Sequence, residues 1–479
     1  MKKKLFFVTL PLIASFLLSG CWNFDFDFNN EPEEIAGFNK KFAEELEEHG
    51  YIRSAEKISP AEVAGIEELD LAAKGFYSGN LTSLKGIEFF TNLRILNCNF
   101  RGIEKLDLSK NTALEEVSVM GNELTELVIR NCQSLRYLDC SGNDLEELNT
   151  EDCVSLDTLD CGSNKLHSLN LEGNRRLKFL SCRYGGGFHK LDLSGNPELL
   201  TVDCTNTGLK ELNVENCRKL EKLNCEFSEI EELNLSTNAA LKELRCRDCN
   251  LKSLDLSKNP QLSELYCSEN NLTELDISGN LILERIDCEE NQLTSLDISK
   301  NAELLSISCG KNRLTSLDIS KNAELYMLTC EDNDIGDIVS GENSKLYILF
   351  CSGNEIRSFT GMPSIVWLEC ADNGMESLDI SGCNDLGALD CSGNRLALLD
   401  TGNCPELYTL LCKDNLLASL DISGNTKLSK FNCELNPGEN NVMRIKAWFD
   451  SVNIPWGFEG TTGQYYYNGA AVRVEYWCE

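Results

Sequence analysis

The chain has 479 residues and carries 77 acidic against 44 basic side chains, a formal net charge of −33 at pH 7. So acidic a surface is repelled by phosphate backbones, and we therefore exclude nucleic-acid binding. The length is sufficient for two to four ordinary domains, but a 21-residue unit recurs through most of the chain, and a repeat array needs no such division.

Residues 1–20 predict a signal peptide. Three lysines precede the apolar run 5–18, which is too short to span a bilayer as a stable helix. The run ends in Leu-Ser-Gly-Cys21, which resembles the bacterial lipobox, whose cysteine is diacylated and becomes the mature N-terminus. The resemblance implies a lipid anchor at Cys21 on a bacterial cell envelope, at the outer membrane or the cell surface. A plain secretory signal with a chance cysteine is the alternative.

Residues 21–32 lack periodicity and contain several Asn and Asp, so we expect a flexible tether. Residues 33–65 predict a helical N-terminal cap in two parts. A second short helix opens at Ser59-Pro60, by its capping residue and its proline in the first turn. The first helix is expected over 33–50, where apolar residues recur at helical spacing, namely Ile35, Phe38, Phe42 and Leu46.

The repeats extend over 66–436. Each contains Leu-x-x-Leu-x-Cys-x-x-Asn-x-Leu and then Leu-Asp-Leu/Ile-Ser-x-Asn, and the first half is the leucine-rich-repeat signature with cysteine in place of the last strand leucine. Alternation places Leu265 and Cys267 inward and Tyr266 outward, as a short strand requires. The second half places Leu275 and Ile277 inward on the opposite wall. Neither half buries its apolar edge alone, so we predict about 18 stacked turns of mostly 21 residues.

Sixteen of the 24 cysteines share one position of the repeat, where a small buried apolar residue is wanted. Neighbouring parallel strands lie ~4.8 Å apart with parallel side chains, whereas a disulfide needs facing Cβ atoms about 3.8 Å apart. We therefore predict free, buried and unreactive thiols, not a disulfide stack or a metal stripe. Bridging between neighbours stays open for a second column at the outer edge, and Cys478 has no assignable partner. The ladder is Cys98, Cys140, Cys161, Cys182, Cys204, Cys225, Cys246, Cys267, Cys288, Cys309, Cys330, Cys351, Cys370, Cys391, Cys412 and Cys433, and the outer column is Cys132, Cys153, Cys217, Cys383 and Cys404.

Two polar columns accompany the cysteines. An asparagine three residues after most ladder cysteines is expected to pair with backbone groups where the strand turns. Between Gly185 and Cys249 this column fails, at Thr207 and Ser228 among others, which predicts a less regular spine. Stacked carboxylates in an aspartate column suggest Ca²⁺, but loop-capping hydrogen bonds explain them as well, and we predict no metal and no cofactor. This column is Asp107, Asp192, Asp255, Asp276, Asp297, Asp318, Asp379, Asp400 and Asp421.

The 21-residue repeats and their cysteine ladder are similar to the internalins, most closely to the internalin type that carries such a ladder. The likeness covers about three quarters of the chain. It implies an α/β fold, a right-handed leucine-rich-repeat solenoid (horseshoe) with a concave parallel β-sheet and little helix outside the caps, and it implies protein binding or adhesion. The segment from Phe38-Asn-Lys-Lys-Phe42 to Tyr51-Ile52 also resembles the N-terminal caps of leucine-rich-repeat proteins exported by Bacteroidetes-type bacteria. Both ends depart from the internalin pattern, in the lipobox and in the lack of a sortase-type tail, so host-cell adhesion does not carry over.

After Asn436 the repeat pattern stops, and residues 437–479 predict a C-terminal cap made of a helix and a β-hairpin. Asn468-Gly469 predicts the hairpin turn, between strands at 464–467 and 470–477. A small binding domain is the alternative, and the aromatic residues of this region make a glycan-binding surface lipoprotein the competing function. The helix is expected over 441–452, where one helical face would carry Val442, Ile445, Trp448 and Val452.

The sequence offers no catalytic constellation, because only His49, His167 and His189 exist and no residues stand at catalytic spacing. We predict that the protein is not an enzyme. We expect a membrane-anchored, extracytoplasmic monomer that binds another protein through the concave face.

A candidate binding surface lies near the C-terminal end of the array. Residues three before, one before and one after each ladder cysteine face the concave side, and here they become apolar. In the competing interpretation, the C-terminal cap covers these side chains, or the shortened 19-residue repeat tilts them into the core. We call this set the apolar patch: Met327, Ile348, Phe350, Trp367 and Leu411.

Overall fold

The computed structural model describes residues 34–73, 81–185, 187–341, 343–440, 442–447, 464–467 and 470–477. The expected signal peptide, Cys21, the tether, Asn468-Gly469 and Cys478 therefore lie outside the described residues, as do Trp448 and Val452. No helix in the described ranges has the length and apolar character needed to cross a bilayer.

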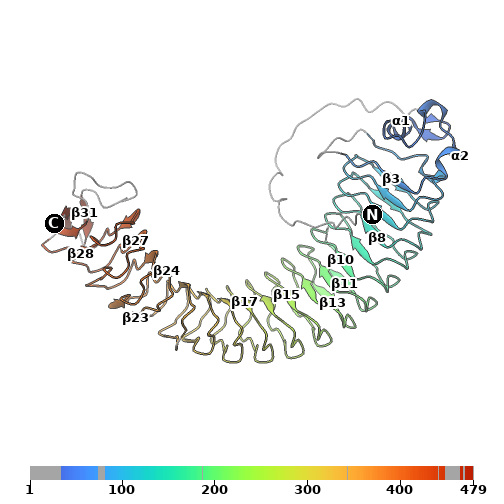
Figure 1. Ribbon diagram of the computed structural model, residues 1–479. Coiled ribbons are helices and arrows are strands. Elements are labelled where there is room, and N and C mark those ends of the chain that lie inside the picture. The colour runs from blue at the N-terminus through green and yellow to red at the C-terminus, as the bar shows by residue number, and fades with distance from the viewer. Residues whose placement is uncertain are drawn as a thin grey trace, which may run out of the picture.

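A long parallel sheet lines the inner face of an open arc (Figure 1). Among the described residues it has eighteen strands, one for each turn, and each strand pairs in parallel with the next. The predicted solenoid of 21-residue turns is thus confirmed. The strands are β3 (Glu68–Asp70), β4 (Ile95–Asn97), β6 (Glu116–Ser118), β8 (Tyr137–Asp139), β9 (Thr158–Asp160), β10 (Phe179–Ser181), β12 (Thr201–Asp203), β14 (Lys222–Asn224), β15 (Glu243–Arg245), β16 (Glu264–Tyr266), β17 (Arg285–Asp287), β18 (Ser306–Ser308), β20 (Met327–Thr329), β22 (Ile348–Phe350), β24 (Trp367–Glu369), β26 (Ala388–Asp390), β27 (Thr409–Leu411) and β29 (Lys430–Asn432).

A second set of short strands forms the opposite wall, and these pair in small parallel groups. Leu275 and Ile277 point into the core from this wall, at 7% and 0% exposure. The core is therefore a narrow apolar column between two walls, to which each turn contributes the same few side chains. The outer strands are β5 (Lys105–Asp107), β7 (Glu126–Val128), β11 (Lys190–Asp192), β13 (Glu211–Asn213), β19 (Leu317–Asp318), β21 (Ile338–Val339), β23 (Ser358–Thr360), β25 (Ser377–Asp379) and β28 (Ser419–Asp421).

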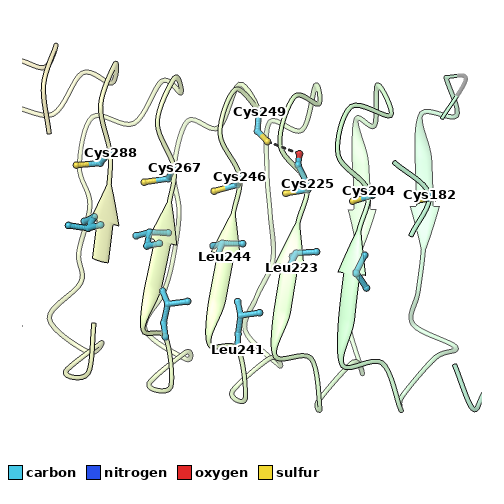
Figure 2. Close-up of a cluster of buried hydrophobic side chains, with 14 of the residues drawn as sticks. Cys182, Cys204, Leu223, Cys225, Leu241, Leu244, Cys246, Cys249, Cys267 and Cys288 are labelled. Carbon is cyan, nitrogen blue, oxygen red and sulfur yellow. Dashed lines mark hydrogen bonds between the residues drawn. The ribbon is translucent and has the colours of Figure 1, made fainter. Parts of the chain in front are cut away.

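The ladder cysteines stack in a row immediately behind the inner sheet (Figure 2). All sixteen are buried with free thiols, and so are the five outer-column cysteines. Some ladder thiols donate to a carbonyl of the next turn, such as Cys204 to Asn224 at 3.3 Å. Outer thiols donate to the preceding turn, such as Cys217 to Leu193 at 3.2 Å. The prediction of free, buried thiols is confirmed for the sixteen ladder cysteines, and the five outer-column cysteines, for which bridging was left open, are free as well.

The asparagine column ties each turn to the next. The Nδ2 group of Asn291 donates to the carbonyls of Cys267 at 3.0 Å and Cys288 at 3.2 Å, and its Oδ1 accepts from the backbone N–H of Leu272 at 3.0 Å. One buried amide thus pairs with three backbone groups on two turns, which confirms the expected role.

Where other residues replace the asparagines of this column, fewer hydrogen bonds join one turn to the next. The hydroxyls of Thr207 and Ser228 donate to the cysteine carbonyl of their own turn, at 2.8 and 2.7 Å, and Ser228 also contacts the thiol of Cys249 on the next turn at 3.3 Å. The thiol of Cys249 does reach one turn back, to the carbonyl of Cys225 at 3.1 Å (Figure 2). The strands keep their register here, so the loss is confined to the turn behind the sheet.

The N-terminal cap is only partly helical. Helix α1 (Lys40–Glu48) begins after Asn39, whose side chain accepts from the N–H of Phe42 at 3.0 Å, and α2 (Pro60–Val63) follows. Two 3₁₀ turns, η1 (Ala55–Lys57) and η2 (Ile87–Phe89), complete the helical content of the described residues. The helix predicted from residue 33 is wrong over its first turns, where β1 (Glu34–Ile35) pairs with β2 (Phe38–Asn39).

That hairpin has a local cause. Ala36 and Gly37 adopt φ angles of 52° and 89°, a left-handed turn that folds Ile35 back beside Phe38. A spacing of three between apolar residues fits one face of a helix and also two facing positions of a hairpin. The spacing of Ile35 and Phe38 therefore did not distinguish the two structures. Phe38, Phe42 and Leu46 are nevertheless fully buried against the first turns, as a cap requires.

The C-terminal region extends the outer wall. Strand β30 (Val442–Lys446) pairs in parallel with β28 and with β32 (Ala470–Trp477), which pairs antiparallel with β31 (Gln464–Tyr467). The helix predicted over 441–452 is therefore wrong at 442–446. Met443 and Ile445 alternate as buried positions, because the open edge of β28 offers backbone groups that a strand satisfies.

Candidate functional site

Three members of the apolar patch stand on adjacent strands of the inner sheet. Met327 of β20 pairs with Ile348 of β22, which pairs with Trp367 of β24. Met327 and Ile348 are half-buried, and Trp367 is 41% exposed. The interpretation in which the shortened repeat tilts Trp367 into the core is thus wrong, and the described part of the C-terminal region adds to the outer wall and leaves the indole exposed.

Trp367 is held in place from two sides. Its indole Nε1 donates to Oε1 of Glu369 at 3.0 Å, and the Phe350 ring meets it edge-on, with centroids 5.2 Å apart and planes at 71°. Edge-to-face pairs of this kind are favourable beyond simple burial. The indole therefore presents a fixed apolar surface and loses little conformational entropy when a ligand covers it.

Leu411 stands apart from the other members. Its neighbours on the sheet are Asp390 and Asn432, and Glu369 and Asp390 separate its row from Phe350. The structure thus brings together Met327, Ile348, Phe350 and Trp367, and it leaves Leu411 as an isolated, half-buried side chain.

A row of tyrosines beside the apolar patch is absent from the sequence prediction. Tyr326, Tyr347 and Tyr408 stand one residue before the strands and are 41%, 50% and 45% exposed. The Tyr408 ring lies over Gly387, where an added Cβ would come within 2.6 Å of its Cε1. Strict alternation would place this position, four residues before the ladder cysteine, on the inward face, but the strands are only three residues long, so this side chain lies outside the alternation and reaches solvent. The sequence signal that could have revealed this row is the recurrence of tyrosine at one position of the repeat.

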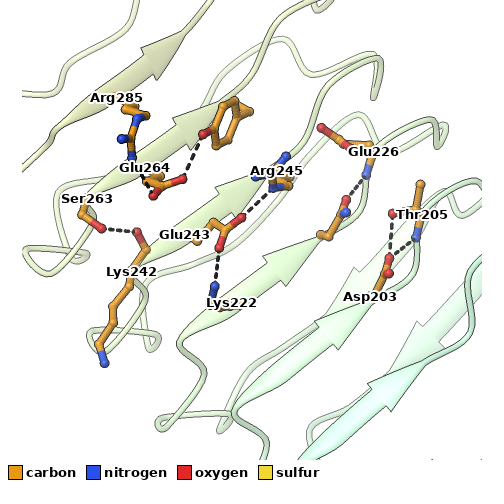
Figure 3. A network of polar contacts seen from close by, with 12 residues as sticks. Asp203, Thr205, Lys222, Glu226, Lys242, Glu243, Arg245, Ser263, Glu264 and Arg285 are labelled. Atoms are coloured by element: carbon orange, nitrogen blue, oxygen red, sulfur yellow. Dashed lines mark hydrogen bonds and ion pairs between the residues drawn. The ribbon is translucent and has the colours of Figure 1, made fainter. Parts of the chain in front are cut away.

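The middle of the concave face is highly charged, and its charges pair with one another (Figure 3). Glu243 accepts from Lys222 at 2.7 Å and from Arg245 at 2.6 Å. One strand further on, Glu264 accepts from Arg285 at 3.1 Å and from the Tyr266 hydroxyl at 2.9 Å. Glu243 and Glu264 thus already have basic partners within this network, so their charges are not available to a ligand.

Three glutamates beside the apolar patch differ from that network. Glu289, Glu331 and Glu369, which we call the acidic strip, are half-buried, and within the described part of the chain no basic side chain lies within ion-pairing distance of them. Burial raises the pKa of Glu331 to about 7, and the Glu289 and Glu369 carboxylates add to this effect. Burial also raises the pKa values of Glu289 and Glu369.

The aspartate column caps loops. Each of its nine members accepts a hydrogen bond from the backbone N–H two residues later, for example Asp276 from Ser278 at 2.9 Å. Hydrogen bonds from the side chain and the backbone N–H of Ser278 lower the pKa of Asp276. In the described ranges no three His, Cys, Asp or Glu side chains are placed to hold a metal ion. The loop-capping interpretation therefore accounts for the column.

No protein-family model and no curated protein sequence matches the chain. Among solved structures, it resembles the functional domain of InlJ from Listeria monocytogenes, which includes a cysteine ladder, with 27% identity and a TM-score of 0.55 over 83% of this chain and 73% of that one. It also resembles YopM from Yersinia enterocolitica, with 20% identity and a TM-score of 0.59 over 86% of this chain and 91% of that one.

A third similar structure is the plant peptide hormone receptor RGFR1 in complex with RGF2. The identity is 18% and the TM-score 0.61, over 75% of this chain and 65% of that one. The likenesses confirm the resemblance that the cysteine ladder indicated: this is a leucine-rich-repeat fold of the internalin type.

Proposed function

We propose that the protein is a lipid-anchored component of a bacterial cell envelope that binds another protein through the apolar patch on its concave face. The observation that carries the proposal is Trp367, an indole that is 41% exposed yet fixed by Glu369 and Phe350. Exposed, preorganised tryptophans are the residues that most often dominate a protein interface. RGFR1, a solved structure of the same fold, holds the ligand RGF2.

Replacing Trp367 tests the surface. Trp367→Ala should leave the unfolding temperature nearly unchanged, because the side chain is largely outside the core, and it should weaken partner binding by ~2 kcal/mol. The partner is first captured from the native environment with the wild-type protein, and its affinity is then measured for both proteins. A large loss of stability with unchanged binding would show that the indole is structural and that the patch has no binding role.

Tyr137→Ala is the matched control. Tyr137 occupies the same repeat position on β8 and is 39% exposed, but it lies far from the apolar patch along the array. Its loss should leave partner affinity unchanged. A glycan array on the full-length protein separates the competing function, because glycan binding that survives Trp367→Ala would point to the C-terminal aromatic residues.

The membrane anchor has its own test. Mass spectrometry of the mature protein should find an acylated Cys21 at the N-terminus, and Cys21→Ser should release the protein from membranes. A non-permeant reagent should label the protein on intact cells. Complete protection from that reagent would favour a scaffold inside the envelope instead.

A further inference from the structure

The acidic strip overlaps the apolar patch at β20 and β24 and extends beyond it to the turn of β17. Glu369 lies two residues after Trp367 on β24, and Glu331 follows β20, the strand that carries Met327. From the turn of Glu289 to that of Glu369 the strip crosses four strand spacings, ~19 Å at ~4.8 Å each. About six residues of an extended chain would cover this distance.

Two carboxylates of the strip lie on either side of a turn that contributes no side chain. Gly310 stands between Glu289 and Glu331 in the same repeat position, and it contributes no side chain. A Cβ added there would meet the backbone O and N of Glu331 at 3.2 and 3.5 Å and its Oε2 at 3.6 Å. Glu289 accepts a hydrogen bond from the hydroxyl of Thr329 at 3.1 Å, two strands further on, so its side chain extends across the turn of Gly310 toward Glu331. Two half-buried carboxylates thus face one another with no cation between them among the described residues.

The acidic strip contrasts with the carboxylates nearest to it. On the neighbouring strands Glu243 and Glu264 each have a basic partner, and Glu290, next to Glu289, pairs with Lys311. Carboxylates that are partly desolvated and unpaired destabilise the fold, and an external cation would relieve that repulsion. Charge complementarity therefore specifies a positively charged partner at this position.

We infer that the partner presents a cationic segment, with a lysine or arginine that pairs with the carboxylates of Glu289 and Glu331 and a neighbouring apolar side chain that covers Trp367. The inference rests on the proposed function and specifies its partner class. A second copy of this chain does not fit, because its net charge is also −33. The charges steer the partner and select it, and the indole contributes contact area.

Random peptides of about a dozen residues, displayed on phage and selected on the full-length protein, test this inference. Enriched peptides should place Lys or Arg close to Trp, Phe or Leu. Their binding should weaken about tenfold in the triple variant Glu289→Gln, Glu331→Gln, Glu369→Gln, and it should weaken as salt is raised. The substitutions remove charge from half-buried sites and should not unfold the protein, which an unfolding curve verifies.

A second triple variant, Glu146→Gln, Glu274→Gln, Glu303→Gln, controls for net charge, because these three glutamates are exposed and lie off the concave sheet. It should bind the selected peptides like the wild type. Enriched peptides without a cation excess, or equal binding to both triple variants, would overturn the inference while leaving protein binding intact. If no peptide prefers the wild type over Trp367→Ala, the proposed function fails at this surface and the inference fails with it.

Discussion

Individual thiols of the ladder are expected to be unreactive because the fold excludes water from them. All sixteen are buried, and burial raises the pKa of Cys351, for example, to about 12. The reactive thiolate is therefore scarce at neutral pH. The ladder cysteines should stay unmodified by thiol reagents in native protein and react fully after denaturation, as counted by mass spectrometry. Rapid native labelling of most of them would contradict the stacked core.

Replacing one ladder thiol by a hydroxyl should be costly. In Cys288→Ser the hydroxyl is buried at a position that has no assured partner, so we expect a loss of about 1–3 kcal/mol in the free energy of unfolding. Cys288→Ala is the control, since it removes the sulfur without adding a polar atom. Equal losses in the two variants, measured by denaturant unfolding, would show that only lost packing matters.

Glu331 should make stability depend on pH. Because burial raises its pKa to about 7, the protonated carboxyl favours the fold, and this contribution is lost as pH rises from about 4.5 through 7. Glu331→Gln keeps the shape without the charge, so it should raise stability at pH 8 on the order of 1 kcal/mol after solvent screening, and change little at pH 5. Unfolding curves at both pH values measure this. An equal change at both would exclude titration as the cause.

Among the elements, the N-terminal cap is fastened by a buried ion pair. Arg101 stands at the asparagine position of its turn, and its guanidinium contacts the carboxylate of Glu45 on α1. Both side chains are buried, at 7% and 6% exposure. The backbone N–H of Arg101 is held by Asn122 at 3.0 Å, so the first ladder asparagine positions the residue that secures the cap.

Breaking this pair should loosen the cap. Arg101→Ala leaves the buried Glu45 carboxylate with only longer contacts, to Lys41 and His49 at 3.7 Å each, so we expect a loss of up to about 3–5 kcal/mol. The double variant with Glu45→Ala should lose clearly less than the sum of the two single losses. Hydrogen exchange of α1, together with unfolding curves, provides the measurement. Additive losses would mean that packing of α1, and not the ion pair, secures the cap.

Over the whole molecule, small repeated interactions add up, because each turn contacts only its neighbours. Hydrogen bonds from the serine two residues later lower the pKa values of seven aspartates of the column. They are Asp192, Asp255, Asp276, Asp297, Asp318, Asp379 and Asp421. Folded-state pKa values below the unfolded ones contribute stability at neutral pH that is lost as pH falls below about 4.

The unfolding temperature should therefore fall steeply below pH 4, after a gentler rise between pH 8 and 5 as Glu331 is protonated. Calorimetry across this range tests both limbs. Added Ca²⁺ should leave the curve unchanged, because the column oxygens already accept backbone hydrogen bonds. A rise of the unfolding temperature on addition of Ca²⁺ would show that the aspartate column binds the metal.

The period and the inward position of Leu265, Cys267 and Ile277 were readable from the sequence alone. They follow from alternation along a short strand and from a fixed spacing, and both are local properties that every turn repeats. The bridging role of Asn291 was predictable for the same reason, since its partners are set by the repeat. The apolar patch was predictable as a set of positions, and Met327, Ile348 and Trp367 do share one row of the sheet.

The tertiary structure alone decided what depends on contacts between distant parts of the chain. Val442–Lys446 became a strand because the edge of β28 lay open beside it. The ion pair of Glu45 and Arg101 joins residues 56 positions apart, outside any repeat phase. Likewise, the sequence shows glutamates all along the concave face, but pairing depends on whether a basic side chain on the next strand comes within reach. Among the described residues Glu243 has such a partner and Glu331 does not, because side-chain distances across strands are set only when the turns stack.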